Sequence, residues 1–212
     1  MRENERLKNE ETAAMQNNSN GQPHSKIQLF ITTGLLTALV FVVTRFLGIP
    51  MPGDGWLNLG DSSIAASALL MPHPLMGFVG GVGSALSNIT SPALIYAPGT
   101  LIIKGAMGYV LYLFAKKGKF TWFALGVFLA EVIMFVGYTV YTFTLYSFAL
   151  LDLEAGVYTA LAGTLLTVPG NLTQAGANFA LALLLFAPIM AVRKALWGSG
   201  PKGSNESSEK QG

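Results

Sequence analysis

The sequence predicts an all-α membrane protein with six transmembrane helices and with both the N- and the C-terminus in the cytosol. Hydrophobic residues make up 51% of the 212 positions and charged residues only 11%, too few to keep a domain of this size soluble in water. The charges gather at the ends, because four of the 13 Lys and Arg precede residue 27 and four follow residue 192. Since each span needs ~20 residues and a turn, the stretch between has room for at most about six or seven. We therefore expect a cytosolic polar tail over residues 1–26, a membrane domain over 27–192 and a second cytosolic polar tail over 193–212.

The first three expected spans differ in composition. The first, over 27–49, carries no charge before Arg45 and ends in a stretch rich in Pro and Gly, which stops the helix and should form an outer loop. The second, over 58–71, is ended by the prolines on either side of His73 and is short for a crossing. It either lies where the bilayer is thin or begins inside the protein. The third, over 75–88, is rich in Gly, Ser and Ala, which let helices approach closely.

The second half of the chain predicts three further spans. An outer loop over 89–98 leads to the fourth span, over 99–115, and a basic turn at 116–119 leads to the fifth. The fifth, over 120–150, is longer than a perpendicular crossing needs, so it should tilt or project outward. After an acidic loop at 152–154, residues 155–169 read as a partial helix or a lid, and the sixth span covers 170–192.

The orientation follows from the basic residues. With an even number of spans, both termini and the turns at 72–74 and 116–119 face the same side. These segments hold 11 of the 13 Lys and Arg. Because basic residues are enriched on the cytosolic side of membrane proteins, both termini are expected in the cytosol.

Several classes of function are excluded by residues that are absent. The chain has no Cys and only two His, so neither a thiolate site nor a histidine metal site is expected. No nucleophile with a base and an orienting partner can be assembled, and the Gly-rich run at 80–83 lies within an apolar span. We therefore expect neither an enzyme nor a resident cofactor or metal. The basic residues are explained by topology, so no nucleic acid partner is expected.

Three ionisable residues, Asp61, Lys104 and Glu131, lie inside expected spans, where charge is costly and needs a partner, water or a function. Asp61 and Lys104 lie near the same outer face, so an ion pair is plausible. That pair either fixes the packing of two spans or contacts a ligand. Glu131 is about 11 residues, or ~16 Å, from the cytosolic end of its span, near mid-bilayer. It is either neutral and bonded to a neighbouring helix, or the floor of a ligand pocket.

A polar stripe on the sixth span indicates a wet cavity. Asn171, Gln174 and Asn178 recur at i, i+3 and i+7, so they share one helix face. Amides also join helices in membranes, so interhelical contact remains the alternative. Aromatic and amide groups from other segments would complete a small-molecule site, although tyrosines at this depth also serve as interfacial or packing residues. The expected ligand-contacting residues are Trp56, Asn58, Tyr96, Lys104, Glu131, Tyr138, Tyr141, Asn171, Gln174 and Asn178.

Three motifs carry a resemblance to a known family. They are the run Trp-Leu-Asn-Leu-Gly-Asp at 56–61, the Gly-rich third span, and Tyr-Ala-Pro-Gly-Thr at 96–100 leading to Ile-Lys-Gly at 103–105. In this order the chain resembles the substrate-binding (S) components of energy-coupling factor (ECF) transporters, in the branch with riboflavin, hydroxymethylpyrimidine and pyridoxine S components. The resemblance covers residues 27 to 192.

The resemblance implies a multi-pass protein of a prokaryotic plasma membrane that captures one vitamin or precursor at the outer face. It implies a membrane coupling subunit and two ATPase subunits as partners, with no ATP hydrolysis by this chain. Family members contact the coupling subunit through small residues on the first span, often Ala-x-x-x-Ala. The matching positions here are Gly34 and Ala38, for which packing within the chain is the alternative.

The ligand expected from the pocket chemistry is pyridoxine or a hydroxymethylpyrimidine-like heteroaromatic alcohol. Riboflavin is the alternative ligand and would need a larger cavity. A different class of function also stays open, in which the chain is an autonomous proton-coupled secondary transporter of a small solute that uses Glu131 as its coupling site.

Overall fold

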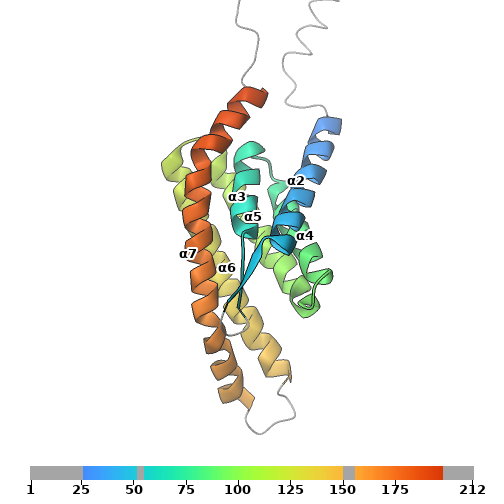
Figure 1. Ribbon diagram of the computed structural model, residues 1–212, viewed down its shortest axis with the longest axis vertical. Helices are drawn as coiled ribbons and strands as arrows, with labels where there is room; N and C mark the ends of the chain where they lie inside the picture. The colour runs from blue at the N-terminus through green and yellow to red at the C-terminus, as the bar shows by residue number, and fades with distance from the viewer. Residues whose placement is uncertain (1–25, 52–54, 150–155, 198–212) are drawn as a thin grey trace, which may run out of the picture. The chain divides into compact units, whose positions relative to one another are not determined.

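The computed structural model describes residues 26–51, 55–149 and 156–197, and within these ranges the chain is mostly helical (Figure 1). The chain divides into two compact units, Met1–Leu35 and Leu36–Gly212. Helix α2 (Lys26–Phe46) crosses this division. Helices α3 to α7 and the two strands lie within the second unit.

A β-hairpin follows α2, where the sequence predicted only an outer loop. Strand β1 (Gly48–Met51) pairs antiparallel with β2 (Gly55–Asn58), and Gly48 lies opposite Asn58. The prolines and glycines that end the helix do not prevent this pairing, since a proline is tolerated in a strand that is an edge strand, as both strands of a hairpin are. The hairpin brings the chain directly to the start of the next helix.

Helices α3 (Gly60–Leu70) and α4 (Met76–Ile89) are short. At 1.5 Å per residue they measure about 16 and 21 Å, less than the ~30 Å hydrocarbon core of a bilayer. Every residue of α3 from Gly60 to Leu69 is buried. A helix enclosed by protein on all sides needs no lipid-facing surface, so α3 begins inside the protein rather than in lipid.

Close backbone contact joins α4 to α5 (Ala97–Ala115), which follows a 3-10 turn, η1 (Leu94–Tyr96). A Cβ atom on Gly81 would lie 2.7 Å from the backbone oxygen of Leu101. A Cβ atom on Gly108 would overlap the backbone oxygen of Met76. Gly81 therefore allows the close approach that was predicted for the third expected span, and Gly108 on the fourth span, which was not part of that prediction, allows it from the other side.

Helices α6 (Phe120–Ala149) and α7 (Gly156–Trp197) are the two longest of the described residues. They lie side by side (Figure 1). The expected division of the last segment, with a partial helix over 155–169 and a span over 170–192, is wrong. Residues 156–197 form one helix of 42 residues that includes Pro169 and Pro188. Membrane helices tolerate an internal proline because neighbouring groups satisfy the freed backbone.

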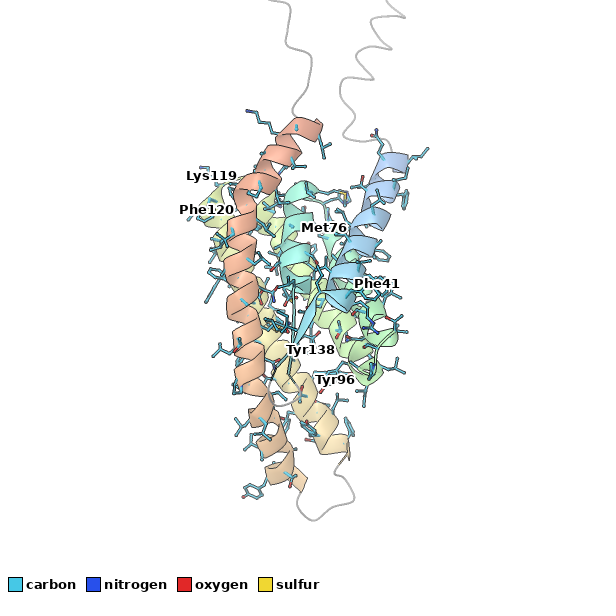
Figure 2. All side chains as sticks on the ribbon, in the orientation of Figure 1. Phe41, Met76, Tyr96, Lys119, Phe120 and Tyr138 are labelled. Carbon is cyan, nitrogen blue, oxygen red and sulfur yellow. The ribbon has the colours of Figure 1, made fainter. Side chains whose placement is uncertain are left out.

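Four helices in the described ranges are long and apolar enough to cross a membrane. They cover Lys26–Phe46, Leu94–Ala115, Phe120–Phe148 and Gly156–Leu196. The protein is therefore a mostly helical, multi-pass membrane protein, while six spans and cytosolic termini stay predictions. In Figure 2, Lys119 and Met76 lie toward the end of the second unit where α7 terminates, and Tyr138 and Tyr96 lie farther from that end.

Candidate functional site

The amide of Asn178 joins α7 to the start of α3. Asn178 is fully buried. Its Oδ1 atom accepts hydrogen bonds from the backbone N–H of Ser62 (3.1 Å) and from the Ser62 hydroxyl (2.7 Å). Its Nδ2 atom donates to the backbone oxygens of Asn58 (2.9 Å) and Gln174 (3.0 Å). An amide offers two donors and one acceptor oxygen with two lone pairs, so the hydrogen-bonding capacity of Asn178 is used up. We call these four residues, Asn58, Ser62, Gln174 and Asn178, the Asn178 clasp.

A buried ion pair lies directly beside the clasp. The ammonium of Lys104 on α5 donates to Oδ1 of Asp61 on α3, and both residues are no more than 3% exposed. Gln174 Nε2 donates to Oδ2 of the same carboxylate at 3.3 Å. The pair that the sequence suggested is therefore formed, and it links α3, α5 and α7.

A chain of hydroxyl groups runs from this pair toward α4. The hydroxyls of Thr100 and Tyr138 are 2.8 Å apart, and Asn88 Nδ2 donates to the Thr100 hydroxyl at 2.6 Å. Lys104 Nζ lies 5.3 Å from the centre of the Tyr138 ring, within range of a cation–π interaction. Sequence reasoning missed Ser62, Asn88 and Thr100 as parts of the network. Thr100 stands four residues before Lys104 on one helix, a spacing that would have placed it on the same face.

Tyr141 holds the turn η1 against α6. Its hydroxyl donates to the backbone oxygen of Ile95 at 2.8 Å, and its ring centre lies 6.0 Å from that of Tyr96. Gly99 makes room for this ring, since a Cβ atom there would lie 2.7 Å from three Tyr141 ring carbons. The two expected aromatic residues are thus brought together from different segments.

Glu131 on α6 is the buried acid whose bonding is incomplete. It is 6% exposed. Within the described residues its Oε2 atom has no hydrogen-bond partner. Its electrostatic neighbours are Asp61 and Lys104. The buried group around the ion pair therefore contains two carboxyl groups and one ammonium.

Two further expected residues lie outside these networks. Asn171 is half-buried, two helical turns from Asn178 on α7. The side chain of Trp56 lies outside the described residues, so its prediction stays as it was.

Asn58 contributes its side chain as well as its backbone, because its Oδ1 atom accepts from the backbone N–H of Gly60 at 3.0 Å.

The fold and its buried polar networks define a multi-pass membrane protein with a polar interior, and comparisons with known proteins give the family. The model of the family described as "ECF-type riboflavin transporter, S component" matches residues 24–191. The chain belongs to this family, which confirms the resemblance seen in its motifs. It is also 37% identical over 110 residues to an uncharacterized protein of Pyrococcus woesei, over 50% of this chain and 73% of that protein. A transporter subunit is consistent with the expectation that the chain is not an enzyme.

Proposed function

We propose that the chain is the S component of an ECF-type transporter that binds a vitamin or vitamin precursor at the outer membrane face. It delivers this cargo to the cytosol together with a membrane coupling subunit and two ATPase subunits. The observation that carries the proposal is the family match over residues 24–191. The proposal includes six crossings, with α3 and α4 counted as two short ones, and cytosolic termini, which the distribution of basic residues supports.

The ligand in this proposal is a heteroaromatic ring that carries hydroxyl groups. The name of the matched family makes riboflavin the first ligand to test, and pyridoxine and a hydroxymethylpyrimidine are the smaller candidates. The paired rings of Tyr96 and Tyr141 offer an aromatic surface. Asn171 and Glu131 offer polar groups whose bonding capacity is not used up within the described residues, as ligand sites usually combine the two.

The other polar residues hold the site in place. Asn178, Gln174, Asp61 and Lys104 are bonded to one another or to the backbone, and breaking those bonds would cost more than a ligand contact returns. We assign them a positioning role. Tyr138 joins them, since its hydroxyl is bonded to Thr100.

The contact with the coupling subunit is proposed for one face of α2. Gly34 and Ala38 are four residues apart on this helix and so share a face. Ala38 is exposed. Small side chains let a second helix approach closely in a membrane, where packing rather than hydrophobicity drives association.

Purification of the protein with and without its coupling module tests the proposal. We expect small heteroaromatic molecules to be released from the purified protein and identified by mass spectrometry, and we expect one of the three candidates to bind in titration calorimetry. We also expect a stable complex with the coupling subunit and ATPases. Absence of both the bound ligand and the complex would refute the proposal.

The buried Glu131 carboxyl favours a second candidate, the autonomous proton-coupled secondary transporter, because membrane carboxyls often carry protons. Uptake into vesicles that contain this chain and no ATPase decides between the two. The S component predicts no concentrative uptake under a proton gradient. Uptake that is abolished by Glu131→Gln would favour the secondary transporter.

A further inference from the structure

Basic residues gather at the end of the second unit where α5 ends, α6 begins and α7 terminates. We call this set the basic end, and its members are Lys116, Lys117, Lys119, Arg193 and Lys194. The acidic side chains of the described residues are Asp61 and Glu131, and both are buried elsewhere, in α3 and in the middle of α6. The described part of the protein therefore supplies no opposite charge to the basic end.

Arg193 is the member of the basic end whose hydrogen bonding is incomplete. The residue is half-buried, and its Nη1 atom is buried without a hydrogen-bond partner among the described residues. A guanidinium stays charged in proteins, so this donor cannot be relieved by losing its proton. A buried charged donor without an acceptor is costly. The planar fork of a guanidinium fits the two free oxygens of a phosphate diester, which would complete its bonding.

The packing of α7 against α6 places this guanidinium beside the turn between α5 and α6. The ring of Phe186 lies 5.2 Å from that of Phe120 and 5.4 Å from that of Phe123, both at the start of α6. Arg193 stands two helical turns beyond Phe186 on the same face of α7. Because side chains on a helix lean toward its N-terminus, Arg193 leans back toward the start of α6, where Lys119 and Phe120 lie in Figure 2.

Aromatic rings accompany the lysines of the turn. Lys117 Nζ lies 3.3 Å from the centre of the Trp122 ring, and Lys116 Nζ lies 5.1 Å from that of Tyr112. Trp and Tyr at the end of a membrane helix are typical of the interface between headgroups and acyl chains.

An apolar surface begins within one helical turn of these charges. Trp122, Leu125 and Phe128 follow one another at three-residue spacing on α6 and are 39%, 43% and 55% exposed. Residues at this spacing are neighbours on a helix surface. A ligand that carries both a phosphate and acyl chains would contact the basic end and this surface together, whereas a soluble phosphate would contact the basic end alone.

We propose that the basic end binds the phosphate of an anionic phospholipid and that Arg193 holds it. The guanidinium donates to the two free phosphate oxygens, the lysines of the turn attract the negative headgroup, and an acyl chain lies along the exposed face of α6. Basic pockets between membrane helices typically bind anionic headgroups. The predicted orientation puts this site in the cytosolic leaflet. The inference depends on neither the vitamin ligand nor the coupling subunit of the proposed function.

Two short-chain phospholipids with identical acyl chains test the assignment, one with an anionic phosphoglycerol headgroup and one with a zwitterionic phosphocholine headgroup. Each is titrated into the purified full-length protein in neutral detergent, and the thermal midpoint is followed, since a lipid that binds the folded state raises it. We expect the wild-type protein to bind the anionic lipid more tightly than the zwitterionic one. Glycerol phosphate, the probe for a soluble phosphate, should leave the midpoint unchanged at the same concentrations.

Variants at neighbouring positions separate a site from a general attraction by charge. Arg193→Gln should weaken binding of the anionic lipid roughly 10- to 150-fold, the range for hydrogen bonds to charged groups. Arg193→Lys keeps the charge but loses the fork, so it should still lose about tenfold. The matched control is Lys194→Gln, which removes the same charge from an exposed side chain one residue farther on and should weaken binding by about fivefold or less.

The remaining outcomes overturn the proposal. Equal losses in Arg193→Gln and Lys194→Gln would mean that the lipid senses only the net charge of this end. Equal binding of the two lipids by the wild-type protein would remove the preference for an anionic headgroup, and glycerol phosphate that binds as tightly as the lipid would assign the site to a soluble phosphate. Unchanged lipid binding in Arg193→Gln with loss of the coupling complex would assign Arg193 to a protein interface. Should Arg193→Gln fail to fold, the comparison of Arg193→Lys with Lys194→Gln decides.

Discussion

Replacing Asn178 by leucine should destabilise the protein far more than it alters ligand contact. The substitution keeps the branched shape and the number of heavy atoms of the side chain but leaves two backbone groups without partners, the buried N–H of Ser62 and the part-buried oxygen of Asn58. The Ser62 N–H lies in the first turn of α3, where no helical acceptor is available. The Ser62 hydroxyl keeps its bond to the backbone oxygen of Asn178 at 3.2 Å, so it adds no further loss.

The magnitude follows from these two orphaned groups. An unsatisfied buried polar group costs about 1–3 kcal/mol, so the Ser62 N–H and the part-buried Asn58 oxygen together cost at most ~6 kcal/mol. Interhelical bonds measured within membranes average only about 0.6 kcal/mol, which lowers the expected range to ~2–4 kcal/mol. With a midpoint shift of roughly 2–4 °C per kcal/mol for a chain of this size, the thermal midpoint in detergent should fall by about 4–16 °C.

Thermal unfolding followed by size-exclusion chromatography measures this shift, and Asn171→Leu is the matched control. Asn171 stands on the same helix but is half-buried and outside the clasp, so its replacement should move the midpoint by less than about 2 °C. Equal midpoints for the two variants would refute the assignment of Asn178 as a structural clasp. So would an unchanged midpoint in Asn178→Leu with lost ligand binding.

Three further predictions concern helix packing and assembly. Gly108→Ala should destabilise the protein by about 1–3 kcal/mol or more, since its Cβ would overlap a backbone oxygen of α4. Gly105→Ala, whose Cβ would lie 3.4 Å from its nearest neighbour, should hardly change the stability. Equal losses of stability in thermal unfolding would contradict the packing argument. Asp61→Asn should lower the free energy of unfolding by about 3–5 kcal/mol because it leaves the buried Lys104 ammonium unpaired, and adding Lys104→Met should recover most of that loss. A double-mutant cycle that shows no coupling between the two positions would mean that the pair does not stabilise the protein. Ala38→Leu should abolish co-purification with the coupling subunit while leaving ligand affinity within about twofold, and an intact complex would remove α2 from the interface.

The parts of the fold that the sequence predicted are those set by charge and by the length of apolar runs. The fourth and fifth expected spans agree with α5 and α6 to within two residues at the ends that the structure describes. The Asp61–Lys104 pair could be predicted because two ionisable groups of opposite charge at the same depth in a membrane stabilise each other. The free-energy cost of exposing an apolar helix to water, or of leaving a charge unpaired in a membrane, is large enough that local packing does not change either outcome.

The parts that the sequence did not predict depend on contacts between distant segments. The boundary expected between residues 169 and 170 lies inside α7, which includes Pro169, because a break in a membrane costs more than a proline in a helix. The hairpin of β1 and β2 was missed because strands of four residues, one of which contains Pro50, carry no clear period-2 pattern. Ser62 was missed because the partners of a hydroxyl cannot be read from its own neighbours in the chain, whereas the four-residue spacing of Thr100 from Lys104 was a signal that could have been used.

The position of the motif at 56–61 explains why the family was easier to recognise than the ligand. Its described polar side chains serve the joints between helices. Asn58 Oδ1 accepts from the first N–H of α3, and Asp61 is bonded to residues of both α5 and α7. Gly60 fits closely against the end of α2, since a Cβ atom there would overlap the Thr44 hydroxyl. A motif whose residues connect helices reflects how the helices pack together and does not depend on the ligand. Outside the motif, Glu131 is a buried acid whose Oε2 atom has no hydrogen-bond partner among the described residues, and we propose that incompletely bonded groups of this kind choose the cargo.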